Sequence, residues 1–169
     1  MKTPLSRDYF YTIITSPVGE LKLVASDAGL AAVTWVTCPN DKPNKTKVPD
    51  ARENAKHPIL AETQKQLTEY FAGKRTKFDL KLDMEGTPFQ KSVWKTLLAI
   101  PYGETVSYTD VAKKVGKPKA VRAVGNANNR NPICIIAACH RVVASSGDLA
   151  GYAGGIEAKK ALLALESAT

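Results

Sequence analysis

A cysteine followed directly by a histidine is the first chemically suggestive feature of this chain, at Cys139 and His140. A thiol attacks as its thiolate, so a nucleophilic cysteine needs a base within reach or surroundings that lower its pKa. His140 can be that base, directly or through a water molecule. Side chains of adjacent residues on an extended chain point to opposite sides, so contact between the two predicts a bend or a bridging water here.

Glu166 is the candidate for a third member of the site, because a carboxylate can orient an imidazole. The separation in sequence leaves that contact open. The alternative interpretation is structural, since unpaired cysteines are among the most buried residue types and then react with nothing. We expect Cys38 and Cys134 to be such loop or core thiols.

Composition limits the other kinds of site. The chain has 169 residues, three cysteines and two histidines, in no spacing typical of a zinc site or of a disulfide framework. We therefore expect neither a metal site nor a disulfide framework. No apolar run is long enough to cross a membrane and no signal sequence is recognisable, which favours a cytoplasmic protein, or a nuclear one in a eukaryote.

Positive charge is concentrated in the second part of the chain. Residues 86–169 carry 11 Lys and Arg against 5 Asp and Glu, whereas residues 1–85 carry 13 against 11. This asymmetry favours a polyanion as the partner of the C-terminal part, since neutralised phosphates release counterions. The alternative is a solvated lysine-rich surface.

The elements that position these residues can be predicted along the chain. Residues 9–15, 20–25 and 30–36 predict an antiparallel sheet, followed by an exposed connector over 38–58. Apolar spacing predicts a helix over 59–73, alternation predicts a strand over 78–82, and Gly86 is the expected domain boundary. Three more helices are predicted: one capped by Thr87 and reaching Ile100, one capped by Ser107 and ended by Gly116, and one over 117–129.

The last two of these helices form a helix-turn-helix pattern. Ala120, Ala123, Val124 and Ala127 repeat at helical spacing, which predicts the inner face. Lys119, Arg122, Asn126 and Asn129 lie on the opposite side, and Gly125 keeps that side thin enough for close approach to a nucleic-acid groove. An ordinary helical hairpin is the alternative. After it, the apolar run of residues 133–139 predicts a strand or extended segment that ends on Cys139.

Residues 86–166 resemble one known family throughout. The stretches GTPFQKSVWKTL, the helix-turn-helix, NPICIIAACHRVV and GYAGG are similar in order and spacing to the O6-alkylguanine-DNA alkyltransferases. The resemblance implies direct reversal of DNA damage, with Cys139 accepting the alkyl group from guanine O6. It also implies that His140 takes the thiol proton through a water, that Glu166 orients His140 and that Asn131 braces the network.

The same resemblance assigns residues to DNA and to the base pocket. It implies that Arg122 enters the base stack in place of the extruded nucleotide, and that Tyr108 presses the neighbouring phosphate and assists the departing guanine. The thin helix face, with Lys119, Ala123, Gly125 and Asn126, would meet the minor groove. The residues that it places at the base pocket are Val142, Tyr152, Gly154 and Gly155.

Chemistry adds two expectations to this resemblance. A thioether is not hydrolysed, so each molecule should react once and need no cofactor. An alkylated base inside a duplex must be extruded to reach a buried thiol. The family usually has proline before the nucleophile, whereas this chain has Ala138, which predicts a looser bend.

The prediction is therefore an α+β protein with a small N-terminal antiparallel sheet-plus-helix lobe, residues 1–85, and a C-terminal helix-turn-helix, winged-helix-like lobe, residues 86–169. The expected partner is double-stranded DNA with alkylated bases, and the expected state is a monomer with no membrane association. Two other classes of function stay open: a Cys-His hydrolase or acyltransferase that turns over many times, and a DNA-binding module whose thiol is inert.

Overall fold

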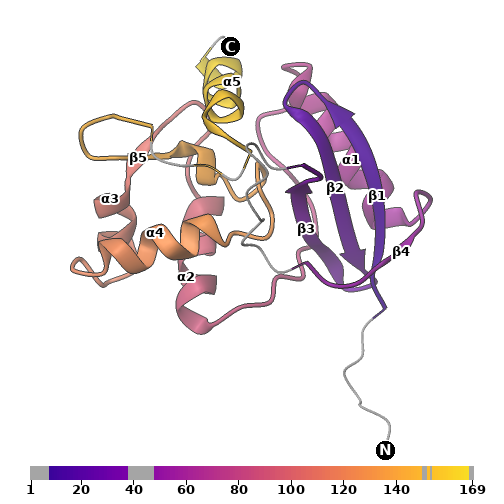
Figure 1. The fold of residues 1–169 in the computed structure, drawn as a ribbon, viewed down its shortest axis with the longest axis horizontal. Helices are drawn as coiled ribbons and strands as arrows, with labels where there is room; N and C mark the ends of the chain where they lie inside the picture. Colours follow the sequence, from indigo (N-terminus) through magenta and orange to yellow (C-terminus); the bar gives the residue numbers. More distant parts are fainter. Residues whose placement is uncertain (1–7, 38–47, 150–151, 153, 168–169) are drawn as a thin grey trace, which may run out of the picture.

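The N-terminal lobe is built on an antiparallel sheet. The computed structural model describes residues 8–37, 48–149, 152 and 154–167. Strands β1 (Phe10–Ser16), β2 (Gly19–Ser26) and β3 (Gly29–Trp35) pair in sequence, as predicted. Helix α1 (Pro58–Phe71) lies across one face of this sheet (Figure 1). It buries Leu60, Leu67 and Tyr70 there, which closes the hydrophobic core of the lobe.

Two predictions about this lobe were wrong in detail. Within the expected connector, the two-residue strand β4 (Arg52–Glu53) pairs parallel to β1. Both its side chains are exposed, so no hydrophobic alternation marks it in the sequence. The expected strand over 78–82 is reduced to one parallel bridge between Leu30 and Leu82. Its alternating apolar residues are half-buried, but only this one residue pairs with the sheet. Cys38 lies outside the described residues.

The C-terminal lobe contains the predicted helices. Helix α2 (Pro88–Leu98) and helix α3 (Tyr108–Lys114) each begin with a reciprocal capping box, made by Thr87 with Gln90 and by Ser107 with Asp110. Helix α4 (Val121–Asn129) follows α3. The short strands β5 (Val106–Ser107) and β6 (Val142–Val143) pair beside α3, and α5 (Ile156–Ser167) closes the lobe. The α+β fold class is confirmed.

The turn between α3 and α4 fixes the helix-turn-helix. Gly116 has a φ of 78°, a conformation that glycine adopts without a steric penalty. The N–H groups of Gly116 and Lys117 donate to the carbonyls of Lys113 and Ala112, which ends α3 in a Schellman motif. Trp94 of α2 then donates its indole N–H to the carbonyl of Ala127, 2.9 Å away, and anchors the end of α4.

The inner face of α4 differs from the predicted stripe. Val124 and Ala127 are buried as expected, and Asn128 is buried with them. Ala123 is exposed instead, because the inner face of this helix lies toward Asn128. The small side chain of Ala123 therefore belongs to the outer surface, together with Arg122 and Asn126.

The apolar run before Cys139 is not a strand. Ile133 makes one bridge to Val33, after which the chain turns, and residues 139–141 form the 3₁₀ turn η2 (Cys139–Arg141). Apolar composition signals burial in such a loop just as it does in a strand, so periodicity could not separate the two. Ala138 has a φ of −79°, close to the angle that proline imposes, so the bend exists without proline.

The two lobes are joined by contacts on both sides of the loop that precedes Cys139. β3 hydrogen-bonds to Pro132 and Cys134, and α5 stands beside the sheet and the C-terminal helices (Figure 1). Among the described residues, no helix combines the length and apolarity that a membrane crossing requires. The core is thus continuous from the sheet to the helix-turn-helix.

Candidate functional site: a thiol, an imidazole and a buried carboxylate

Cys139 lies at the start of η2, where its side chain is buried at 3% exposure. Asn131 braces the loop that leads to it. Its side-chain amide donates to the carbonyl of Ala137 at 2.7 Å, and its oxygen accepts from the N–H of Ile133 at 3.0 Å. The predicted bend is present, because the 3₁₀ turn replaces the extended geometry that would hold Cys139 and His140 apart.

His140 and Glu166 form a buried pair. The Nε2 of His140 lies 2.6 Å from a carboxylate oxygen of Glu166, and both side chains are at most 1% exposed. Burial lowers the pKa of His140, even though the carboxylate opposes that effect, so the imidazole is neutral at pH 7. With its proton on Nε2 toward Glu166, the ring has its lone pair on Nδ1. Nδ1 is buried and has no hydrogen-bond partner within the described structure.

Glu166 also binds residues that the sequence did not single out. Arg141 donates from Nε at 2.7 Å and from Nη2 at 2.9 Å, and the hydroxyl of Tyr70 donates at 2.6 Å. Burial alone would raise the pKa of Glu166, but the hydrogen bonds from His140 and Arg141 outweigh it and hold the pKa well below its usual range. The carboxylate is therefore charged, which fixes the tautomer of His140.

Lys159 is a second buried charge that sequence reasoning missed. Its ammonium donates to the carbonyl of Val142 at 2.8 Å, and the residue is fully buried. Burial lowers the pKa of Lys159, whereas the nearby Cys139 opposes that effect by favouring the charged form. Its place on α5, seven residues before Glu166, was the available signal: both positions fall on one helix face.

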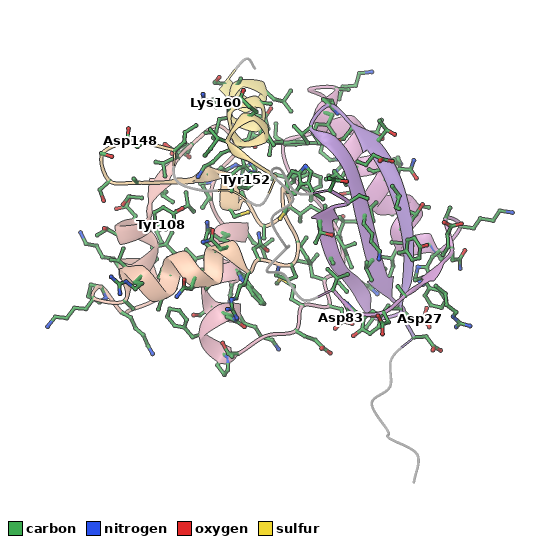
Figure 2. The ribbon with its side chains drawn as sticks, in the orientation of Figure 1. Asp27, Asp83, Tyr108, Asp148, Tyr152 and Lys160 are labelled. Carbon is green, nitrogen blue, oxygen red and sulfur yellow. The ribbon has the colours of Figure 1, made fainter. Side chains whose placement is uncertain are left out.

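The residues expected at the base pocket come from several elements. Val142 is fully buried. Tyr152 lies at the boundary between the C-terminal lobe and the sheet (Figure 2), edge-on to Trp35 with ring centroids 5.3 Å apart. Gly154 packs on the same indole, since a Cβ there would come within 2.4 Å of Trp35. Gly155, with a φ of 90°, continues the turn into α5.

Two tyrosine hydroxyls are close to Cys139. Burial raises the pKa of Tyr152 well above its usual value, and the neighbouring Cys139 raises it further. Tyr108, at the first turn of α3, is labelled on the other side of the lobe in Figure 2. Burial raises the pKa of Tyr108 too, again with a contribution from Cys139. Both hydroxyls therefore keep their protons at neutral pH, and that of Tyr152 is buried with no hydrogen-bond partner among the described residues.

The outer face of α4 is separate from this buried network. Lys119, Arg122, Ala123 and Asn126 are exposed, and a Cβ on Gly125 would meet no atom within 4 Å. None of the ion pairs found among the described residues involves Lys119 or Arg122. This face presents unpaired positive charge on a thin helix surface, which suits contact with a phosphate backbone.

The arrangement suits proton removal from a buried thiol by an imidazole that a carboxylate orients. Within the described residues no group of three or more His, Cys, Asp or Glu side chains could hold a metal ion. A buried thiol beside this imidazole and carboxylate pair is a group of side chains that suits nucleophilic chemistry.

Comparisons with known proteins agree with this arrangement. Residues 9–84 match the family model for the 6-O-methylguanine DNA methyltransferase ribonuclease-like domain, and residues 88–168 match the model for the DNA binding domain of the same enzymes. A methylated-DNA–protein-cysteine methyltransferase of Methanosarcina barkeri is 49% identical over 93% of this chain and 96% of its own length.

Solved structures give the same result. The O6-methylguanine methyltransferase of Mycobacterium tuberculosis superposes with a TM-score of 0.82 at 44% identity, over 95% of this chain and 93% of that one. The structure of M. tuberculosis OGT in complex with DNA superposes with a TM-score of 0.80 at 45% identity, over 94% and 93% of the two chains. The chain belongs to the methylated-DNA–protein-cysteine methyltransferase family.

Proposed function

We propose that this protein repairs alkylated DNA by direct reversal, with Cys139 as the acceptor. The bond between guanine O6 and the alkyl carbon breaks, and a bond between that carbon and the Cys139 sulfur forms. The thiol proton leaves toward His140, and the guanine regains a proton at its ring. Because the product is a thioether, each molecule acts once. O4-alkylthymine is a second substrate of the same chemical kind.

The observation that carries this proposal is the buried hydrogen bond between His140 and Glu166, one residue from a buried cysteine. The carboxylate fixes the imidazole with Nδ1 as its acceptor. A water between Nδ1 and the Cys139 thiol completes the path for the proton. Tyr108, which is protonated at neutral pH, assists the departing guanine by donating a hydrogen bond to it.

A buried thiol also explains the need for the helix-turn-helix. The alkylated base is extruded from the duplex and enters a pocket lined by Val142, Tyr152, Gly154 and Gly155. Arg122, exposed on α4, takes its place in the stack. Ala123 and Gly125 allow the helix backbone to approach the minor groove, with Lys119 and Asn126 at its sides.

The working form is a monomer with two lobes, residues 1–85 and residues 86–169. It acts where DNA is found, in the cytoplasm or in a eukaryotic nucleus. The N-terminal lobe supports the transfer site through Tyr70 and Trp35, which contact Glu166 and Tyr152. The bend at Ala138 keeps a proline-like φ, which supports transfer despite the missing ring.

Intact-mass and peptide mass spectrometry after incubation with an O6-methylguanine duplex test the proposal. We expect one methyl group per chain, located on Cys139, and no further turnover when substrate is in excess. Cys139→Ser should lose transfer but bind the duplex nearly as well as the wild type, since the thiol lies apart from the α4 surface. A methyl group on Cys134 or Cys38 would refute the assignment. Repeated turnover would indicate a hydrolase or acyltransferase, and duplex binding without mass gain an inert thiol.

A further inference from the structure

Strand β3 is the edge strand of the sheet that lies beside the C-terminal lobe (Figure 1). Val33 and Trp35 are two residues apart on it, so they share one face of the strand, and both are buried. The N–H of Val33 donates to the carbonyl of Pro132 at 2.8 Å. The N–H of Cys134, a buried core thiol as expected, donates to the carbonyl of Val33 at 3.1 Å. β3 is thus bound to the loop that precedes Cys139, and Trp35 follows on the same face.

The indole of Trp35 is held in place by its own lobe. Its N–H donates to the carbonyl of Val18, in the turn between β1 and β2, at 2.9 Å. Gly19, the first residue of β2, approaches the same ring, since a Cβ there would lie 3.7 Å from Cδ1. Only 5% of Trp35 is exposed. Close packing and a satisfied indole N–H together restrict the ring to one orientation.

On its other side the indole contacts two residues expected at the base pocket. The ring of Tyr152 lies edge-on to it, with centroids 5.3 Å apart and an interplanar angle of 77°. A Cβ on Gly154 would lie 2.9 Å or less from three atoms of the indole, so the backbone of Gly154 rests directly on the ring. The N–H of Gly155 donates to the carbonyl of Tyr152 at 2.9 Å, which ties these residues into one turn. The indole therefore blocks this turn from moving toward the sheet.

This turn also carries a polar group without a partner. The hydroxyl oxygen of Tyr152 is buried and has no hydrogen-bond partner among the described residues. Buried hydroxyls are nearly always hydrogen-bonded, so an unpaired one at this place indicates a group that enters from outside. In the proposed function that group is the extruded base.

We propose that Trp35 is a positioning residue that sets which alkyl groups Cys139 accepts, because its indole supports Tyr152 and Gly154 from behind and limits the space beside the thiol. This role rests on the proposed function, in which these two residues line the base pocket. Trp35 takes no part in the bonds that form and break. A methyl group needs little space, whereas a benzyl group needs the turn to move back. In a closely packed interior the indole must then move as well.

The test compares alkyl transfer from two duplexes of one sequence, the first with O6-methylguanine and the second with O6-benzylguanine. Single-turnover rates are measured at saturating protein, so that differences in duplex affinity do not enter. Trp35→Leu removes the ring behind the turn, and Trp35→Phe leaves a smaller ring there. Trp94→Phe is the matched control, because Trp94 is also buried and packs closely on a glycine, Gly86, but lies on α2.

We expect Trp35→Leu to raise the ratio of the benzyl to the methyl transfer rate about tenfold, the low end of what apolar pockets achieve by size. Trp35→Phe should raise this ratio by less, and Trp94→Phe should leave it unchanged. A wild-type ratio in both Trp35 variants, whatever their absolute rates, would assign Trp35 to packing alone. An equal rise of the ratio in Trp94→Phe would also overturn the role.

A second measurement tests the contact between the indole and the turn. Gly154→Ala adds a Cβ that overlaps the indole, so the turn must move into the pocket, and we expect methyl transfer to slow about tenfold or more. The double variant Trp35→Leu, Gly154→Ala has room for this Cβ and should recover most of the lost rate. Residues in contact couple in such a cycle, whereas independent residues give additive losses. Additive losses would contradict the proposal.

The wild type separates this proposal from the function. A wild type that accepts neither alkyl group refutes the proposed function, and the role of Trp35 falls with it. A wild type that accepts the methyl group, with Trp35 variants that keep its rate ratio, refutes the role of Trp35 alone. Far-UV circular dichroism identifies a variant that misfolds. If Trp35→Leu does not fold, the same cycle with Trp35→Phe decides, and a wild-type ratio again contradicts the role.

Discussion

The carboxylate of Glu166 accepts hydrogen bonds from residues of both lobes of the molecule. Tyr70 reaches it from α1, Arg141 and His140 from η2, and the N–H of Gly103 from the loop after α2. Removing one partner of a buried ion pair leaves the other charge without compensation, which is far more costly than losing an exposed pair. This one residue therefore links the proposed proton path to the stability of the fold.

We predict that Glu166→Gln lowers the free energy of unfolding at pH 7 by about 3–5 kcal/mol, because Arg141 becomes a buried charge without its partner. The folded pKa of Glu166 is lowered, so its contribution is complete above the unfolded value of about 4.3 and is lost as pH falls through the folded value. The lowered pKa of His140 adds a loss that begins below about pH 6.5, where the unfolded imidazole takes up a proton.

Urea unfolding between pH 3 and pH 8 measures this dependence. The wild type should lose stability steadily with acid, and Glu166→Gln should lose less below about pH 4.3, where the wild-type carboxylate is being protonated. Glu157→Gln is the matched control, because Glu157 is on the same helix with its side chain 92% exposed. A glutamine variant with wild-type stability at pH 7 would show that the network does not stabilise the fold.

Arg122 offers a second test at the scale of one residue. Extruding a base costs a few kcal/mol, and a guanidinium that stacks in the gap offsets part of that cost. We predict that Arg122→Ala slows methyl transfer from duplex DNA even at saturating protein, and leaves transfer from free O6-methylguanine nearly unchanged. Arg130→Ala, at the exposed end of α4, removes the same charge and serves as the control. A wild-type saturating rate on duplex would leave Arg122 with phosphate contact alone.

At the scale of elements, the helix-turn-helix depends on local signals that the sequence displays. Two capping boxes and a glycine turn place α2, α3 and α4, and each is encoded within a few residues. Their outer surface carries Lys113, Lys114 and Lys119, all exposed. The structure therefore separates an exposed, positively charged surface from the buried loop that carries Cys139.

We predict that duplex binding weakens steeply with salt and shows little sequence preference. Each lysine that contacts a phosphate adds about 0.9 to the slope of log affinity against log salt. The double variant Lys113→Ala, Lys119→Ala should reduce that slope by about 2, whereas Lys65→Ala, exposed on α1, should leave it unchanged. Titrations at several salt concentrations measure it, and a salt-independent affinity would exclude the electrostatic surface.

The difference between local signals and contacts across the fold explains which features could be predicted from the sequence. The three long strands, the helices and the two capping boxes were predictable because their signals are local and periodic, whereas the short strand β4 carries no such signal. The segment of residues 133–139 was mistaken for a strand or extended segment, since burial gives turns and strands the same apolar composition. Tyr70 and Lys159 were missed because their importance comes from contacts across the fold, and a tyrosine or lysine at helical spacing looks like ordinary packing or surface.

At the scale of the whole molecule, the two lobes are connected through the site itself. Trp35 of β3 packs against Gly154 and Tyr152, and Tyr70 reaches Glu166 from α1. One hydrophobic cluster of buried residues runs from the sheet through α2 to α5. Separate unfolding of either lobe would expose this shared core, so the lobes should unfold together.

The two tryptophans of the chain make this testable, because Trp35 lies in the sheet and Trp94 in α2. The variants Trp35→Phe and Trp94→Phe each keep one tryptophan. We predict that the tryptophan fluorescence transition of each variant in urea coincides with its far-UV circular dichroism transition. A fluorescence midpoint that departs from the circular dichroism midpoint in either variant would show that the lobes unfold independently.

The residues that hydrogen-bond to Glu166 are far from it along the chain, so a ribosome synthesises them earlier. Tyr70 and Glu166 are 96 residues apart, and His140 precedes Glu166 by 26. At about 5–20 residues per second, a ribosome adds the carboxylate roughly 1–5 seconds after the imidazole. A nascent chain therefore carries its acceptor thiol before the group that orients the base. In the proposed mechanism His140 is oriented only once α5 has docked, so we expect Cys139 to gain its full reactivity only in the complete fold.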